Sequence, residues 1–191
     1  MKASLFVTEI IDKYIKDEEL KRLLITHSRC VAEKALQIAE GLKRMGKIDL
    51  QFIYDAAMLH DIGVVRCNAP AIHCHGSLAY ITHGMAGGEI LRKEGIPEKY
   101  CRVCERHTGS GITAREIKEF RLPLPEMDLL PETFEEKLIC YADKFFSKSS
   151  TPDMEKQRFK VIASMEKHGP EALERFLRLE EELTVKRSHE Q

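Results

Sequence analysis

Helical periodicity dominates the pattern of hydrophobic and polar positions along this chain. Apolar residues recur at intervals of three and four, the spacing that places them on one face of an α-helix. The stripe that runs from Val31 through Ala35 and Ile38 to Leu42 is typical. No segment reads as a strand pair or as a strand–helix–strand unit. The pattern therefore predicts an all-α fold.

Local capping signals support several of the predicted helices. Asp49 is a suitable N-cap for the apolar segment that follows it, and Thr133 with Glu136 forms a capping-box sequence. Pro97 stands where the first turn of a helix tolerates proline. Helices are predicted over residues 1–15, 20–46 (with a break near Thr26 or His27 and an end at Gly46), 50–61, 84–94, 97–108, 113–120, 133–147, 153–168 and 170–186.

Residues 64–82 differ from the rest of the chain because they show no clear period. The segment is rich in histidine, cysteine, glycine and proline, and a connection of this length without its own periodicity is typical of a functional loop. Residues 122–131 contain three prolines and are predicted to cross the surface.

The length of 191 residues fits one domain. We expect a core over about residues 20–150, with the C-terminal helices of residues 153–187 packed on it. The formal net charge of −1 provides no overall attraction to a nucleic acid polymer or to an anionic membrane. A small anionic substrate remains compatible with the composition, because a local site can be positive on a nearly neutral protein.

The N-terminal segment and the cysteines indicate a cytoplasmic protein. The first helix carries Glu9, Asp12 and Lys13 among its apolar residues, unlike a secretory signal, and no apolar run approaches the length of a membrane span. Six scattered cysteines are too few for a secreted disulfide scaffold of this size, so we expect free thiols.

Candidate chemistry arises from acids and imidazoles that fall on apolar helices. His27 heads the stripe described above, His60 and Asp61 end an otherwise apolar helix, and Asp143 lies among residues that should be buried. Each has an ordinary structural explanation when taken alone: a satisfied core histidine, or Asp143 paired with Lys144. Burying all of them is costly unless something pairs with them, and a divalent cation can pair with the whole set.

These residues resemble the signature of a known family. His27, then His60-Asp61-Ile62-Gly63, then Tyr141-Ala142-Asp143-Lys144 resembles the H…HD…D pattern of the HD-domain superfamily, including its HDIG form. The resemblance spans about residues 20–150. It implies a single-domain HD helical bundle, usually with phosphohydrolase activity towards nucleotides or related phosphoesters. On this resemblance His27, His60, Asp61 and Asp143 would ligate one metal ion.

Two further histidines extend the resemblance to proteins with binuclear sites. His83 and His107 stand in the interval where such HD proteins carry two additional ligands, and the counterpart of Asp61 bridges the metals. The segment around His107 is similar to that of HD-type symmetrical dinucleoside tetraphosphate hydrolases. The chain lacks the GYP signature of HD-GYP cyclic dinucleotide phosphodiesterases. The alternative is that His83 is a solvated helix residue and that His107 caps the C-terminus of its own helix.

A structural zinc site is a competing interpretation. Cys101, Cys104 and His107 lie at intervals of three, and four more candidate ligands lie upstream. Zinc ligands of this kind normally sit on a turn rather than inside one helix, which favours Cys101 and Cys104 as small apolar core residues. The upstream candidates are Cys67, His73, Cys74 and His75.

The working hypothesis from the sequence is hydrolysis of a phosphoester or phosphoanhydride, with a small phosphorylated partner that is a nucleotide. The metal, which can be Fe, Mn, Co, Ni or Zn, would activate water. His73 or His75 would protonate the leaving oxygen. Phosphate contacts are expected from a group of basic and glycine-rich positions: Lys144, Arg66, Arg106, Arg115 and the stretch 108–111.

Two other classes of function share these residues. A nucleotide-binding sensor would use the same pocket without turnover, and a di-iron oxygenase of the HD type would need oxygen and redox-active iron. The last helix carries an amphipathic face formed by Leu173, Phe176, Leu177 and Leu183, which would either pack on its own domain or form a homodimer.

Overall fold

The computed structural model of the chain describes residues 1–42, 48–149 and 151–184. Within these ranges the protein consists of α-helices, short 3-10 turns and one small sheet, so the predicted all-α class is confirmed. The α-helices are α1 (Leu5–Tyr14), α2 (Glu18–Gly41), α3 (Leu50–Leu59), α4 (His83–Lys93), α5 (Glu98–Arg106), α6 (Ala114–Glu119), α7 (Phe134–Asp143), α8 (Arg158–Glu166) and α9 (Pro170–Thr184).

The second helix is continuous, so the predicted break near Thr26 or His27 is wrong. The Asp17 side chain caps its start by accepting a hydrogen bond from the Leu20 amide, and buried residues follow one another on a single face past His27. The Thr26 hydroxyl donates to the carbonyl of Arg22 one turn earlier, which satisfies it inside the helix. The predicted helix ends at Gly46 and Lys186 lie outside the described residues.

The segment without periodicity folds into short pieces. Three 3-10 turns, η2 (Ile62–Arg66), η3 (Pro70–Ile72) and η4 (Tyr80–Thr82), are joined by the antiparallel pair β1 (Asn68–Ala69) and β2 (Cys74–His75). The expectation that no strands pair is wrong here, because two-residue strands are too short to show an alternating pattern.

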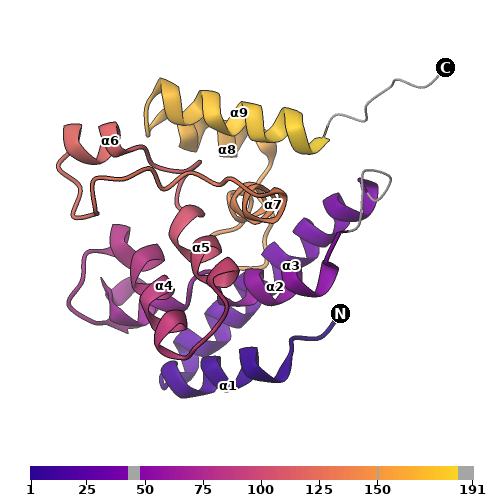
Figure 1. The fold of residues 1–191 in the computed structure, drawn as a ribbon, viewed down its shortest axis with the longest axis vertical. Helices are drawn as coiled ribbons and strands as arrows, with labels where there is room; N and C mark the ends of the chain where they lie inside the picture. Colours follow the sequence, from indigo (N-terminus) through magenta and orange to yellow (C-terminus); the bar gives the residue numbers. More distant parts are fainter. Residues whose placement is uncertain (43–47, 150, 185–191) are drawn as a thin grey trace.

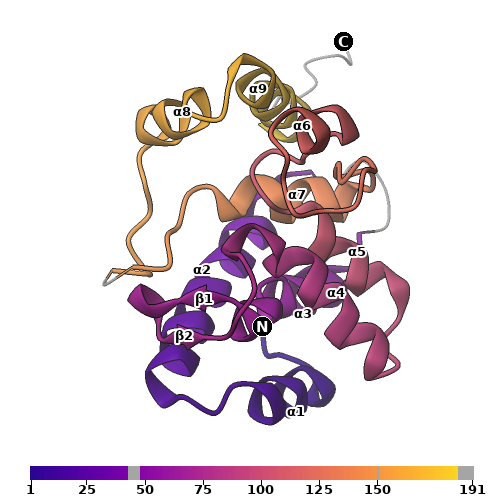
Figure 2. The same cartoon turned by 90° about the vertical axis from the view of Figure 1, so that its left-hand side faces the viewer.

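The helices form a body with a C-terminal layer above it (Figures 1 and 2). The lower body contains α1 to α5, α7 crosses the middle, and α8 and α9 lie above α7 with α6 beside them. α9 packs its apolar face inward, where the ring of Phe176 stacks on Tyr141 of α7 with centroids 5.4 Å apart.

The end of α7 differs from its predicted boundary at Ser147. Phe145 and Phe146 donate to the carbonyls three residues earlier, so the backbone tightens and the α-helix stops at Asp143. The chain then leaves α7 with Lys144 and Lys148 close to the last residue of the helix.

α4 and α5 form a tightly packed antiparallel hairpin. Gly84 lies so close to α5 that an added Cβ would be 2.5 Å from the Cys104 carbonyl oxygen, and at Gly87 it would lie 3.2 Å from the Cys104 side chain. This close approach brings the first residue of α4 next to the last residues of α5.

Gly63 allows η2 to pack directly on the start of α4. A Cβ at this position would lie 2.0 Å from the His83 carbonyl oxygen and 2.3 Å from the Gly87 amide nitrogen. Both neighbours are backbone atoms, which cannot move aside as a flexible side chain can. The glycine after His60-Asp61-Ile62 is therefore required by the contact between η2 and α4.

We expect Gly63→Ala to lower the free energy of unfolding by about 1–3 kcal/mol or more, because overpacking must push η2 away from α4. Urea unfolding followed by circular dichroism measures this change. Gly41→Ala is the matched control, since an added Cβ there meets no atom within 4 Å, and it should be neutral or stabilising by up to about 1 kcal/mol. Equal unfolding midpoints for Gly63→Ala and the wild type would contradict the packing argument.

Candidate metal centre

Four buried side chains from three helices converge in the middle of the molecule. His27 comes from α2, His60 and Asp61 follow the last residue of α3, and Asp143 ends α7. The Nε2 atom of His27 lies 3.2 Å from Asp61 Oδ2 and 3.0 Å from Asp143 Oδ1. The Nε2 atom of His60 lies 3.0 Å and 3.4 Å from the same two oxygens. One ion could contact all four side chains.

A second group shares Asp61. His83 begins α4 and His107 follows the last residue of α5, and both are buried rather than solvated. Their Nε2 atoms lie 3.0 Å apart, and each lies 3.3 Å from Asp61 Oδ1. Asp61 therefore presents Oδ2 to the first group and Oδ1 to the second.

The backbone sets the orientation of three of these imidazole rings. The Nδ1 atoms of His60, His83 and His107 lie 2.6, 2.7 and 2.7 Å from the carbonyl oxygens three residues earlier. A neutral ring that donates its Nδ1–H in this way presents an unprotonated Nε2 on the other side. The same arrangement orients histidine ligands in metal proteins. When neutral, each of these rings therefore directs its Nε2 lone pair towards the oxygens of Asp61.

These converging atoms fit a cation. Within the described part of the chain, His27 Nε2, His60 Nε2 and both Asp61 oxygens are buried without a hydrogen-bond partner. Buried acceptors that face one another are costly unless a positive charge lies between them. A mixture of imidazole nitrogen and carboxylate oxygen suits a divalent transition metal and does not select one metal.

The charges of the groups follow from their surroundings. Burial alone would lower the pKa of His60, but the charge of Asp61 and contact with Asp143 raise it to about 9. Burial would raise the pKa of Asp61, but the charges of His60 and Lys148 hold it well below its ordinary range. The pKa of Asp143 is lowered against burial by two lysine charges. Burial lowers the pKa of His107 to about 3.

Two lysines contact the carboxylates. The Nζ atom of Lys144 lies 2.6 Å from Asp143 Oδ2 and donates to the His107 carbonyl at 3.1 Å. The Nζ atom of Lys148 lies 2.8 Å from Asp61 Oδ2. Lys144 is recognisable in the sequence as a neighbour of Asp143, whereas the only sequence signal for Lys148 is its position shortly after the end of an apolar helix.

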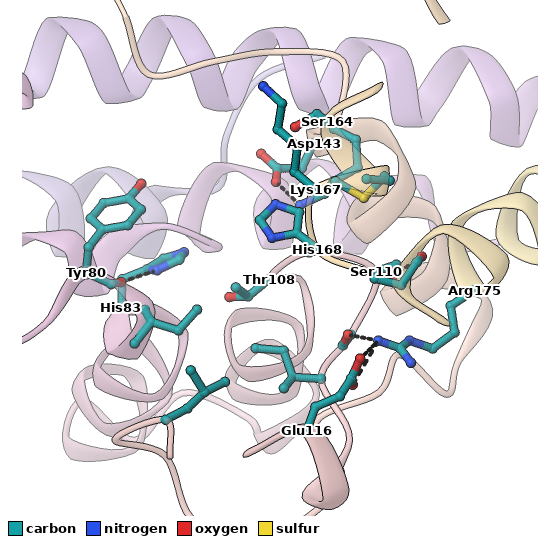
Figure 3. Close-up of a pocket in the computed structure, with 18 of the residues that line it drawn as sticks. Tyr80, His83, Thr108, Ser110, Glu116, Asp143, Ser164, Lys167, His168 and Arg175 are labelled. Carbon is teal, nitrogen blue, oxygen red and sulfur yellow. Dashed lines mark hydrogen bonds and ion pairs between the residues drawn. The ribbon is translucent and has the colours of Figure 1, made fainter. Parts of the chain in front are cut away.

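A cavity of about 590 Å³ opens beside these groups (Figure 3). His83, Asp143 and the two lysines line one part of it, and the Tyr80 ring that stacks on His83 lies at its edge. The glycine-rich stretch 108–111 also lines the cavity, as the sequence suggested for a phosphate-binding turn. The remaining wall comes from α6, α8 and α9 and from residues outside these helices, including Phe120, Lys156, Lys167 and His168.

Other residues singled out in the sequence lie away from this cavity. Arg66 pairs with Glu89, Arg106 with Glu132 and Glu136, and Arg115 with Glu171. None of the three arginines contributes to the described lining. His73 and His75, predicted as proton donors, are exposed and also lie outside the lining. The geometry therefore does not support the general-acid role for either histidine.

The cysteines do not form a metal site in the described structure. Cys101 and Cys104 are buried in the core, and no cluster of potential ligands among residues 1–42, 48–149 and 151–184 includes a cysteine. The Cys104 thiol points to the Leu59 carbonyl oxygen at 3.5 Å. This geometry supports core packing over the structural zinc interpretation.

None of the described helices is both long enough and apolar enough to cross a membrane.

Comparison with known proteins gives two matches to part of a longer protein and one match to nearly the whole of a protein. A tRNA (cytidine(56)-2'-O)-methyltransferase of Picrophilus torridus is 36% identical over 133 residues, which are 70% of this chain and 34% of that protein. The methyltransferase of the same name from Thermoplasma volcanium is 32% identical over 163 residues, covering 85% of this chain and 42% of that protein. The chain thus spans less than half of either methyltransferase.

A third relative is similar over nearly its whole length. An uncharacterized protein of Methanocaldococcus jannaschii is 34% identical over 161 residues, which are 84% of this chain and 87% of that protein. No solved structure matches the chain.

The family comparison agrees with the residues that form the centre. Residues 24–147 match the HD domain, and this segment contains both histidine and aspartate groups. The match covers well over half of the sequence. The chain therefore belongs to the HD domain family.

Proposed function

We propose that this protein is a metal-dependent phosphohydrolase that cleaves a phosphoester or phosphoanhydride bond of a nucleotide-type substrate. The observation that carries the proposal is the pair of buried ligand groups that share Asp61 and adjoin a cavity lined by lysines. His27, His60, Asp61 and Asp143 would hold one ion, and Asp61, His83 and His107 a second.

The chemistry divides between the ions and the chain. Divalent ions held there would supply a water of lowered pKa and neutralise charge on phosphate oxygens. Fe, Mn, Co, Ni and Zn all suit the donor set. Backbone carbonyls hold the imidazoles of His60, His83 and His107, so the donor atoms of these three rings are oriented before any ligand binds.

The residues beside the ligand groups suit a phosphate. Lys144 and Lys148 bring two ammonium groups to the edge of the cavity, where each already contacts one of the carboxylates. Gly109 and Gly111 have positive φ angles of 59° and 85° in the turn that lines the same cavity. Turns of this kind can direct backbone N–H groups at an anion.

The names of the two methyltransferase relatives bear on the substrate. Those proteins act on tRNA by name, and this chain corresponds to about a third and two-fifths of their lengths. The names therefore give no methyltransferase activity to this chain. They do favour RNA-derived nucleotides, and tRNA itself, as members of a substrate panel.

Assay of a panel of phosphorylated substrates tests the proposed phosphohydrolase activity. We expect protein loaded with Mn²⁺, Fe²⁺, Co²⁺, Ni²⁺ or Zn²⁺ to release phosphate or a nucleotide from at least one nucleotide, cyclic nucleotide, dinucleoside polyphosphate or tRNA substrate. Asp61→Asn should lose activity by several orders of magnitude, because both ligand groups depend on this carboxylate. Asp153→Asn, an exposed aspartate, is the control. Tight binding without product would identify a sensor, and oxygen consumption with iron would identify an oxygenase.

The second ligand group predicts a change in metal stoichiometry. Wild-type protein saturated with Mn²⁺ should bind about two ions per chain, and His83→Ala or His107→Ala should bind about one. Elemental analysis after removal of free metal measures the ratio. His75→Ala, which removes an exposed histidine outside both groups, should keep two. A wild type that saturates at one ion would show that the second group holds none.

Metal binding should release protons at neutral pH. The pKa of His60, raised to about 9 in the protein without metal, means that this imidazole is charged near neutrality, whereas a metal ligand must be neutral. Titration with Mn²⁺ at about pH 7.5 should therefore release about one proton, and the release should vanish at about pH 10. Calorimetry in buffers of different ionisation enthalpy measures it. The same enthalpy in all buffers at the lower pH would refute the assignment of charge.

A further inference from the structure

We propose that α8 and α9, which follow the segment that matches the HD domain, form a wall of the cavity that recognises the organic part of the substrate, and that this part is a flat group of about nucleoside size. The inference rests on the proposed function, because it assumes that the phosphate lies at the metal end. It adds a binding subsite outside the HD ligand set.

The C-terminal helices contribute a continuous wall to the cavity. Ser164 and Met165 of α8 and Arg175 of α9 line it (Figure 3 labels Ser164 and Arg175). Two contacts tie this wall to the glycine-rich turn: Ser110 Oγ donates to the Ala172 carbonyl at 2.7 Å, and Arg175 Nη2 donates to the Gly111 carbonyl at 3.1 Å. The wall is therefore joined to the turn beside the metal centre.

The size of the cavity exceeds the needs of a phosphate group. Its volume of about 590 Å³ lies within the range of about 300–1,000 Å³ found for pockets that enclose drug-sized ligands. Much of the space therefore remains for the group to which the phosphate is attached.

The charges in the cavity are unevenly distributed. Lys156 Nζ donates to the Phe146 carbonyl at 2.9 Å and to the Lys144 carbonyl at 3.5 Å. It therefore lies beside the segment that carries Lys144 and Lys148. The three lysines at this end outnumber the two carboxylates, Asp61 and Asp143, even before a metal ion is counted. This end therefore favours an anion.

The ion pair in the C-terminal wall is neutral, and Lys167 and His168, which follow α8, also line the cavity. Arg175 Nη2 lies 2.7 Å and 2.9 Å from the two carboxylate oxygens of Glu116, so the pair cancels its own charge. The Arg175 Nε atom is buried and has no hydrogen-bond partner among the described residues. A guanidinium that is already paired with a carboxylate suits a neutral polar group better than a second phosphate.

An aromatic side chain is part of the same lining. Phe120, after α6, is 59% exposed although it lines the cavity together with the apolar side chains of Ile112 and Leu122. An accessible ring in a cavity provides a stacking surface for a flat group. The stacking ring, the apolar side chains beside it and the neutral Arg175–Glu116 pair together favour a flat organic group in this part of the cavity.

Binding of ADP and inorganic pyrophosphate to the Mn²⁺-loaded protein tests the inference, because the two probes share a diphosphate and differ in the nucleoside. Calorimetry at equal free Mn²⁺ should show ADP binding about tenfold tighter or more. Phe120→Ala and Ser164→Phe should each remove most of this advantage while the affinity for pyrophosphate changes by less than about twofold. The first removes the ring, and the second fills the cavity.

Matched controls come from the same region. Phe159→Ala removes a ring that is 63% exposed on α8, and Ala163→Phe adds a ring beside Ser164, and neither position belongs to the cavity lining. Both controls should bind the two probes as the wild type does. Thermal unfolding of each variant verifies that the fold is kept. Because Phe120 is exposed, its removal should leave the unfolding midpoint near that of the wild type.

The outcomes separate the two proposals. Equal affinity of the wild type for both probes, or variants that weaken both by the same factor, would overturn the subsite. ADP selectivity that depends on Phe120 and Ser164 supports it, whether or not the protein turns over a substrate. Selective binding without turnover of any member of the panel would leave the subsite standing and reject the phosphohydrolase.

Discussion

The two carboxylate oxygens of Asp61 lie where the histidines of the central helices meet those of the α4–α5 hairpin. Five side chains meet them, four imidazoles and the Lys148 ammonium, in a place closed to bulk solvent. Such burial is unfavourable by itself. The apolar faces of α2, α3 and α7 and the tight α4–α5 hairpin supply the packing that holds these groups together.

The C-terminal ends of α3 and α5 set the orientation of two of these imidazole rings. His60 and His107 each follow the last residue of a helix, and each ring bonds back to a carbonyl of the turn that precedes it. The same bonds reduce the number of unsatisfied carbonyls at the helix ends and fix the side of each ring that faces Asp61. Structural and chemical requirements therefore coincide at these positions.

The sequence allowed much of this to be predicted, because periodicity and capping residues report local structure directly. The helices that lead to His60 and to Asp143 follow from apolar spacing, whereas the predicted break near His27 is absent from α2. The HD pattern marks the ligand candidates. Lys148 could not be distinguished from a surface lysine, since its environment comes from the turn after α7. The cavity wall from α8 and α9 depends on tertiary packing that leaves no local pattern.

The separate origins of the two ligand groups have a mutational consequence. His27, His60 and Asp143 belong to the central helices, whereas His83 and His107 both belong to one helical hairpin. Substitution within that hairpin can delete or restore the second pair of imidazoles while His27, His60 and Asp143 keep their places on the central helices, although Asp61 contacts both groups. On the proposed function, a few substitutions in the α4–α5 hairpin would convert a binuclear centre into a mononuclear one, or the reverse, with the residues of the central helices unchanged.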